Sequence, residues 1–366
     1  MSTLIEKTKN FVDSEVKNWI ADHNTISSYP EKLIMSMANL GIFGMNIPKI
    51  YGGLDLKSKE IFYVVRELAQ GFIPLTGALG SHLKVSRYIV KFGTPTQKQL
   101  LLPDMASGKI IAAHAFTESE GKSVDTMQTK LTKENNKLIL KGRKTLVTNA
   151  ANANLIAIVS ANCLSRKEAN KKVAIILLPR NQKGLSVGID IPRLGMEGIS
   201  LCELVFECQV LDEQVLGGCN LDGRDAIQES QTETLINYSS RAVGLAETIV
   251  EETINFTNTK KSYDKLLRDI PAVQDKIALM KDGFKKDKSM LDDIISKLEV
   301  GEDVAKYAYK VKALITESTV DIARIGLALH GGAGYTKKFH IERHFREAMG
   351  LTLIGTPTDI ALEKAK

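Results

Sequence analysis

The sequence predicts a multidomain α+β protein made of three consecutive parts. We expect an N-terminal helical domain at residues 1–110, a central antiparallel β-barrel or sandwich at 111–220, and a C-terminal bundle of the four-helix type at 221–366. Apolar residues recur at helical spacing in the first part, short runs rich in Ile, Val and Leu fill the second, and long periodic segments form the third. A chain of 366 residues is long enough for two or three such units.

The first part contains signals for helix starts and ends. An apolar stripe of helical spacing begins near Leu33 and stops at Gly41. In the segment GTPTQKQLLLP, Thr94 and Gln97 form a capping box, because their side chains can satisfy free amides, and Pro95 suits the first helical position. These features predict a domain built from helices.

The pattern changes near residue 109. The segments KLILKGRKTLVTN, NLIAIVSA, KVAIILLP, LSVGIDI and ELVFECQV are apolar runs of strand length, separated by polar turns such as KENNK. Runs at this spacing are expected of an antiparallel sandwich or a small barrel, and the region ends near VLGG.

Long helices return in the last part. Periodic apolar stripes predict helices over Asp222–Phe256, Ile270–Leu298 and Glu302–Leu329, a shorter one from Lys338 and a last one from Thr358. Their apolar faces must be covered, so we expect them to pack together as a bundle.

Composition favours a soluble protein with an anionic small-molecule ligand. No apolar run could cross a bilayer and the acidic N-terminus lacks a signal sequence, so we expect a cytoplasmic protein without a membrane span. Four cysteines without a CxxC pair or a histidine cluster predict free thiols and no metal site. The net charge of +6 suits a nucleotide or phosphopantetheine, but it is too small and scattered for nucleic acid.

Five segments occur in a fixed order along the chain. They are ANLGIFGMNIPKIYGGLDL, KFGTPTQKQLLLPDMASGKIIAAHAFTE, LKGRKTLVTNAANAN, RLGMEGISLCELVFE and LHGGAGYTKKFHIERHFREA. In order and spacing they resemble the acyl-CoA dehydrogenase family, and the likeness runs from about residue 10 to the last residue. One such string would be weak evidence, whereas five in register across three domains are specific.

The resemblance implies an oxidoreductase that is a flavoprotein, usually a homodimer or homotetramer, with FAD between the β domain and the bundle. Members typically desaturate an acyl thioester: a carboxylate takes the α proton while hydride leaves the β carbon for flavin N5. The implied partners are an acyl-CoA or acyl-carrier-protein thioester and an electron-accepting flavoprotein or oxygen.

Two segments of the β domain resemble parts of the family that touch the flavin. HAFTESEGKS resembles the TEPGAGSD loop, which places Thr117 against the ring and Ser123 against the pyrophosphate. TLVTN resembles the WITN strand, so Thr148 would bond near flavin N5 and Leu146 replaces the tryptophan that usually covers the ring. Without the resemblance, these would be an ordinary polar turn and a strand threonine.

Two segments of the bundle resemble contacts to the other half of FAD. NTKKSYDKLLRDIPAVQ resembles a stretch that reaches the FAD of a neighbouring subunit, with Lys260, Tyr263 and Gln274 at the contact positions. Lys260 replaces an arginine, which keeps the charge but loses its bidentate geometry. In LALHGGAGYT, Gly331 and Gly332 allow close backbone approach to the adenosine, although an ordinary helix end would use them equally well.

The usual catalytic base is missing from its turn. LIGTPTDI resembles the family's YEGT turn, in which the glutamate before the glycine commonly takes the α proton. Ile354 occupies that position and cannot accept a proton. The same resemblance leaves Thr356 and Thr358 as contacts to FAD.

Some relatives carry the base on the first long helix of the bundle instead. Counting back from RAVGLAE, that position is Thr234, with Glu233 directly before it. A shift of one residue turns a helical side chain by about 100°, so we expect Glu233 to reach the site only if the helix start is displaced or irregular. A solvated glutamate is the competing interpretation.

Together these residues predict an FAD-dependent acyl-thioester dehydrogenase with Glu233 as its candidate base. One alternative is a flavin oxidase or monooxygenase of the same fold, which needs no carboxylate at Ile354. The other is a non-catalytic partner subunit that completes a neighbour's FAD site, because fold alone does not establish catalysis.

Overall fold

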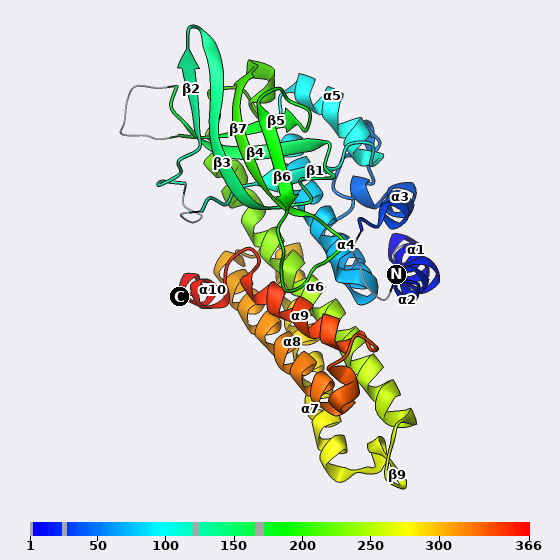
Figure 1. The fold of residues 1–366 in the computed structure, drawn as a ribbon. Coiled ribbons are helices and arrows are strands. Elements are labelled where there is room, and N and C mark those ends of the chain that lie inside the picture. Colours follow the sequence, from blue (N-terminus) through cyan, green and yellow to red (C-terminus); the bar gives the residue numbers. More distant parts are fainter. Residues whose placement is uncertain (1–2, 24–27, 120–123, 165–171) are drawn as a thin grey trace.

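The computed structural model describes residues 3–23, 28–119, 124–164 and 172–366. Figure 1 shows a twisted sheet at one end of the molecule and a bundle of long helices that extends away from it. The N-terminal helices lie beside the junction between the two. The predicted order of helical, β and helical parts is therefore confirmed.

The N-terminal part is helical as predicted. Its α-helices are α1 Thr3–Phe11, α2 Lys17–Ala21, α3 Glu31–Asn39, α4 Ser58–Phe92 and α5 Pro95–Ala106, with a π-helical turn at Val12–Val16. The capping box of α5 is present, since the Thr94 hydroxyl accepts a bond from the Gln97 amide at 3.2 Å and the Gln97 side chain accepts from the Thr94 amide at 2.9 Å. The Gln97 amide group also donates to the carbonyl of Val215 at 2.8 Å, which ties α5 to the end of the β domain.

Helix α4 consists of two halves that fold back on each other. Phe72 has φ −147° and ψ 95°, which breaks the helix just before Pro74. As a result Ser58 of the first half and Arg87 of the second half both contact Glu233. The second half, residues 73–92, packs on the sheet and forms one wall of the cavity described below.

The β domain is a mixed sheet, so the antiparallel prediction is wrong in part. Its strands are β1 Ala112–Ala115, β2 Lys130–Glu134, β3 Lys137–Thr148, β4 Leu155–Asn162, β5 Lys172–Pro179, β6 Leu185–Asp190 and β7 Leu201–Val210. Their order is β1-β4-β2-β3-β7-β6, with β5 on β4, and both β1 and β2 run parallel to β4. Only strands joined by tight turns must be antiparallel, and neither of these pairs is joined in that way. Among the described strands the sheet does not close into a barrel.

The sheet packs on α4 through β4. Every residue of β4 is buried, which explains why its sequence is a continuous apolar run rather than an alternating one. Leu155, Ala157 and Val159 pack with Val85 and Ile89 of α4, while the intervening residues of β4 face the core on the opposite side of the sheet. This packing fixes the second half of α4 relative to the strand ends.

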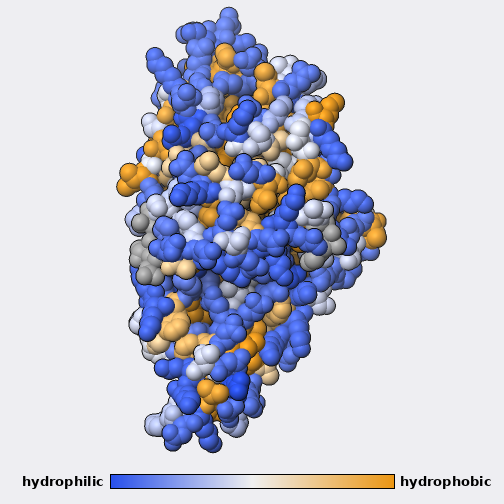
Figure 2. All heavy atoms as spheres, turned by 90° about the vertical axis from the view of Figure 1, so that its right-hand side faces the viewer, coloured by the Kyte–Doolittle hydropathy of each residue, from blue (hydrophilic) through white to orange (hydrophobic). Residues whose placement is uncertain are grey.

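The C-terminal helices begin and end close to the predicted residues. They are α6 Gly223–Thr259, α7 Pro271–Glu299, α8 Ala305–Gly334, α9 Ile341–Leu353 and α10 Thr358–Lys364. A small hairpin of β8 Lys261–Ser262 and β9 Lys265–Leu266 joins α6 to α7 at the tip farthest from the sheet (Figure 1). Among the described residues no helix is long and apolar enough to cross a membrane. The face in Figure 2 is largely hydrophilic, with hydrophobic atoms in scattered small groups.

Asp287 of α7 is a buried acid inside this bundle. Its side chain is 1% exposed, and its Oδ2 atom has no hydrogen-bond partner in the part of the chain that the structure describes. Burial raises the pKa of Asp287 to about 7, and a hydrogen bond with Ser318 and the charge of Lys286 offset only part of this rise. The carboxyl group is therefore most compatible with the fold when it is protonated.

We expect Asp287→Asn to stabilise the protein above pH 7 and to change it little near pH 4. The pKa of this acid is higher in the folded protein than in the unfolded chain, where it is about 3.9. As the pH rises from the lower to the higher of these pKa values, the free energy of unfolding therefore falls by up to about 1.4 kcal/mol per pH unit. Urea-unfolding midpoints at acidic and alkaline pH measure this difference. Asp282→Asn on the exposed side of α7 is the control, and an equal effect of Asp287→Asn at both pH values would contradict the assignment.

Candidate active site

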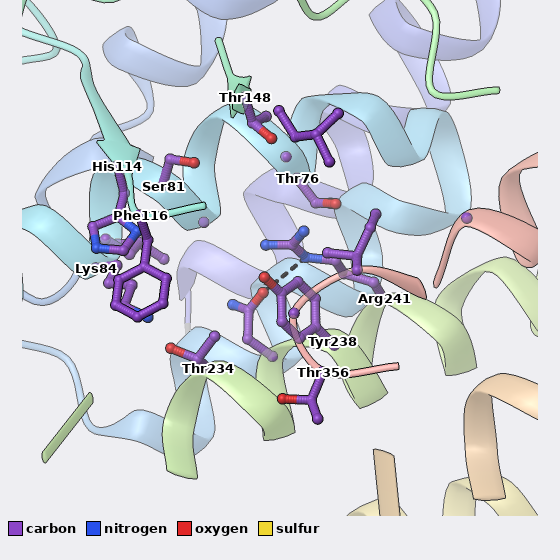
Figure 3. Close-up of a pocket in the computed structure, with 18 of the residues that line it drawn as sticks. Thr76, Ser81, Lys84, His114, Phe116, Thr148, Thr234, Tyr238, Arg241 and Thr356 are labelled. Atoms are coloured by element: carbon purple, nitrogen blue, oxygen red, sulfur yellow. Dashed lines mark hydrogen bonds between the residues drawn. The ribbon is translucent and has the colours of Figure 1, made fainter. Parts of the chain in front are cut away.

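A cavity of about 860 Å³ lies where the β domain, α4, α6 and the C-terminal turn meet (Figure 3). The second half of α4 forms one wall and α6 forms the facing wall. The ends of β1 and β3 and the turn before α10 close the remaining sides. The side chains that these elements contribute include Thr76, Ser81, Lys84, His114, Phe116, Thr148, Thr234, Tyr238, Arg241 and Thr356.

Glycines of α4 make room in the cavity wall. Gly77 and Gly80 are three residues apart and therefore lie on the same face of the helix. A Cβ atom at Gly77 would lie 3.5 Å from the Thr148 side chain, and one at Gly80 would overlap the guanidinium of Arg241. These positions let α4 approach both the strand end and the facing helix.

A β-bulge turns Leu146 into the cavity. The pairing of β3 with β7 shifts between Lys144 and Val147, and Leu146 has φ 53°. Its side chain is 51% exposed although the neighbouring Val147 is buried. A half-exposed hydrocarbon beside Thr148 and Thr117 is a surface that a flat aromatic ring would cover, so these residues fit a bound flavin.

A buried ion pair, which no local sequence pattern predicted, holds the loop that contains Thr117. Glu118 accepts a bond from Lys144 at 2.8 Å and from the backbone amides of Gln128 and Thr129 at 2.7 and 3.0 Å. Burial raises the pKa of the Glu118 carboxyl, but these donors outweigh it and hold the pKa at about 2. The Thr145 amide also donates to the carbonyl of Thr117 at 2.9 Å. Ser123, the predicted pyrophosphate contact, lies outside the described residues.

Lys312 of α8 fixes the turn that contains Ile354. Its side chain is fully buried, and its ammonium group donates to the carbonyls of Thr352 and Thr356 at 2.9 and 2.8 Å. Gly355 has φ 74° and lies against the ring of Tyr238, where a side chain would clash. The turn therefore presents Ile354 and Thr356 to the cavity in a defined geometry.

We expect Lys312→Met to destabilise the protein by about 1–3 kcal/mol, because it leaves two buried carbonyls without their donor. The turn should lose more stability than the rest of the protein. Amide hydrogen exchange of residues 352–356 should therefore accelerate more than that of the β domain. Lys310→Met on the exposed face of α8 is the matched control. Uniform acceleration across the chain would show that Lys312 does not act on this turn.

Glu233 lines the cavity without any irregularity in its helix. Helix α6 is continuous, and the Glu233 carboxylate points to α4, where it accepts a bond from the Ser58 hydroxyl at 2.8 Å and pairs with Arg87. The side chain of Thr234 also lines the cavity, and its hydroxyl donates to the carbonyl of Ser230 at 2.7 Å. The displaced or irregular helix start that we expected is therefore absent from α6, and the role of Glu233 as the base stays a prediction.

The remaining predicted residues that the structure describes do not line this cavity. Those at the far end of the bundle are Lys260, Tyr263, Gln274, Gly331 and Gly332. Tyr263 is 99% exposed, and Gly331 breaks α8 with φ 60° while the helix continues to Gly334. Thr358 lies at the start of α10 and donates to Glu317 at 2.6 Å. Within one chain, the structure thus brings together Thr117, Leu146, Thr148, Glu233 and Thr356, and leaves the other described residues apart.

Several cavity residues had not been predicted from the sequence, and two of them are His114 and Arg241. His114 of β1 lies 3.2 Å from the Tyr88 hydroxyl and stacks on Phe116, close to the segment that contains Thr117. Arg241 projects from α6 into the cavity (Figure 3), where it donates to the Asn237 side chain and lies over the Tyr238 ring. The basic residue in RAVGLAE was the available signal, but periodicity alone does not show which face of a long helix is hollow.

Family models match the chain in three consecutive blocks. The N-terminal domain of acyl-CoA dehydrogenase matches residues 2–109, the middle domain matches 113–208, and the C-terminal domain matches 222–365. These blocks follow the helical, β and helical parts of the structure.

Individual relatives agree with this match. The 3-(aryl)acrylate reductase of Clostridium sporogenes (strain ATCC 15579) is 26% identical over 352 residues, which cover 94% of this chain and 92% of the relative. The butyryl-CoA dehydrogenase of Megasphaera elsdenii shares the fold with a TM-score of 0.90 at 20% identity, over 100% of this chain and 97% of its own. The prolyl acyl carrier protein oxidase AnaB does so with a TM-score of 0.88 at 23% identity, over 99% and 97%.

The geometry and the comparisons lead to the same conclusion. The cavity is lined by threonines and a half-exposed leucine that a flat aromatic ring would cover, and a solved structure of the same fold contains FADH2. Three family models together span nearly the whole chain. The chain belongs to the acyl-CoA dehydrogenase family and is an FAD-binding oxidoreductase of that family.

Proposed function

We propose that the protein desaturates an acyl thioester between its α and β carbons. The observation that carries this proposal is the composition of the cavity, in which the threonines predicted to contact flavin and a carboxylate line one continuous space. Glu233 is the only carboxylate among the described residues that line it. Bound FAD supplies a hydride acceptor, which is the chemistry that protein side chains lack.

In this proposal Glu233 takes the α proton. The α C–H bond breaks and an O–H bond forms on the carboxylate, while FAD, when bound, would accept the hydride from the β carbon so that a C=C bond remains. Ser58 and Arg87 hold the carboxylate in place, since both contact it from α4. Thr117, Leu146, Thr148 and Thr356 would hold the flavin ring.

Most of the other predicted FAD contacts act between subunits in this proposal. Ser123 and Thr358 would bind FAD from the same chain, while the remaining contacts reach a neighbour's FAD in a homodimer or homotetramer. Tyr263 supports this arrangement, because an aromatic ring that is 99% exposed in one chain is suited to a subunit contact. The residues that would reach across are Lys260, Tyr263, Gln274, Gly331 and Gly332.

The thioester is carried by coenzyme A or by an acyl carrier protein, and both end in phosphopantetheine. Arg193, Arg224 and Arg346 line the cavity and provide positive charge for such an anionic arm. The prolyl acyl carrier protein oxidase among the fold's solved structures supports the carrier-protein form. An electron-transferring flavoprotein is the proposed acceptor, because such a protein is named in another structure of this fold; oxygen is the alternative acceptor.

The test is anaerobic reduction of the bound flavin. We expect the purified protein, reconstituted with FAD, to lose visible flavin absorbance when a saturated acyl-CoA or acyl-carrier thioester is added. Failure to bind FAD would refute the enzyme proposal for the isolated chain. FAD binding that occurs only after a second protein is added would indicate a non-catalytic partner subunit. A hydroxylated product formed in the presence of oxygen would indicate a monooxygenase.

A further inference from the structure

Arg241 of α6 is a buried cation that lacks a carboxylate partner. Its residue is 6% exposed, and its Nε donates to the Asn237 side chain at 2.8 Å. Its guanidinium lies over the Tyr238 ring, 4.9 Å from the centroid. Within the described ranges no acid forms an ion pair with it, although four other arginines that line the cavity each have one: Arg87, Arg193, Arg224 and Arg346.

The free end of the guanidinium faces the cavity. In Figure 3 it lies in the space between α4 and α6, below Thr76. Gly80 of α4 makes this position possible, because any side chain there would overlap it. Asn237 occupies Nε, which leaves the two terminal nitrogens as a pair of parallel donors.

Arg241 keeps its charge in this environment. Burial lowers the pKa of Arg241 to about 10, and Tyr238 opposes the shift. The guanidinium is therefore a cation at neutral pH. Removing a charge from water costs several kcal/mol unless another charge compensates it, so an anion is the expected occupant of this part of the cavity.

Arg241 lies beyond the position where the thioester would react. It is eight residues, or about 12 Å of helix, past Glu233. The ring of Tyr238 between them packs against Gly355 of the C-terminal turn. Arg241 is also more deeply buried than the Glu233 side chain, which is 20% exposed. A substrate whose α carbon is near Glu233 would present the far end of its acyl chain to Arg241.

We propose that the acyl group ends in a carboxylate and that Arg241 selects it, so that the substrate is the monothioester of a short dicarboxylic acid. Two parallel donors of a guanidinium match the two oxygens of a carboxylate. This inference rests on the proposed desaturation and names its substrate class. A hydrocarbon chain in the same position would leave the cation buried and uncompensated.

The experiment compares substrates of equal shape and different charge. Succinyl-, glutaryl- and adipyl-CoA are each paired with the thioester in which an isopropyl group replaces the terminal carboxylate. Dissociation constants come from the shift of the flavin spectrum, and reduction rates from its anaerobic loss. We expect the best dicarboxylic thioester to bind about 100-fold more tightly than its hydrocarbon counterpart, the effect of a desolvated charge pair.

Three variants then locate the preference. Arg241→Met should abolish or reverse it, Arg241→Lys should retain part of it, and Arg324→Met, which removes an exposed arginine of α8, should leave it unchanged. Arg241→Met should also raise the urea-unfolding midpoint of the ligand-free protein, because it removes an uncompensated buried charge. A lowered midpoint with unchanged preference would make Arg241 a structural residue and overturn the inference.

The outcomes separate this inference from the proposed function. If hydrocarbon thioesters bind and reduce the flavin as well as dicarboxylic ones, the carboxylate proposal is wrong and desaturation stands. If dicarboxylic thioesters bind selectively through Arg241 but reduce no flavin, desaturation is wrong and the binding assignment stands.

Discussion

Replacing Glu118 by glutamine is expected to lower the free energy of unfolding by about 3–5 kcal/mol, the cost of leaving a buried charge without its partner. Lys144 is fully buried, and besides Glu118 its ammonium group bonds only to the carbonyl of Phe116 among the described residues. Burial already lowers the pKa of Lys144 despite the carboxylate. The variant should also hold less FAD, because Glu118 follows Thr117 directly. Chemical unfolding and the flavin-to-protein ratio measure the two effects.

The control uses an ion pair of the same sheet that is exposed. Lys141 and Glu207 lie 2.8 Å apart on β3 and β7, with both side chains about two-thirds exposed at 67% and 65%. Glu207→Gln should change stability by less than about 1 kcal/mol. In Glu118→Gln/Lys144→Met both charges are absent, so much of the lost stability should return. If Glu118→Gln and Glu207→Gln have equal effects, the buried pair does not hold the loop.

The stability of Glu118→Gln should also depend on acidic pH less than the stability of the wild-type protein does. The Glu118 carboxyl has a folded pKa of about 2, below the value of about 4.3 expected for an unfolded glutamate. The unfolded chain therefore binds more protons between these values. The stabilisation that Glu118 provides is complete above about pH 5 and is lost as the pH falls to about 2. Glu118→Gln should lack this portion of the acid dependence.

Periodicity and turn chemistry predicted most of the fold because they are local properties. The capping box of Thr94 and Gln97 and the ends of α6, α7 and α9 depend on residues a few positions apart. The parallel pairing of β1 with β4 depends instead on which distant strand lies alongside, and no local pattern encodes that choice. The antiparallel prediction was wrong at that point.

The residues of the site likewise fall into those that local motifs predicted and those that depend on distant contacts. Motif resemblance identified Thr117, Leu146 and Thr148, and the structure places all three on one cavity. Lys312 acts on a turn 40 residues later, and Arg241 fits only because Gly80 on another helix lacks a side chain. Such contacts join residues that are far apart in the sequence, so they become visible only when the helices are placed.

Replacing Glu233 by glutamine is expected to slow anaerobic flavin reduction by about 100- to 10,000-fold, the usual contribution of a general base. Glutamine keeps the shape and can still accept the hydrogen bond from Ser58, but it cannot take a proton at neutral pH. FAD content and the dissociation constant of the thioester should change little, because the proton moves only in the reaction step. Stopped-flow absorbance of the flavin measures the rate.

Glu229→Gln is the matched control for this prediction. Glu229 lies one turn earlier on α6 and pairs with the same Arg87, but it does not line the cavity. Its variant should reduce flavin at nearly the wild-type rate. Because Lys312 holds the C-terminal turn at the cavity, Ile354→Glu should restore much of the rate that Glu233→Gln loses. An unchanged rate in Glu233→Gln would exclude this carboxylate as the base. Another group would then have to accept the α proton.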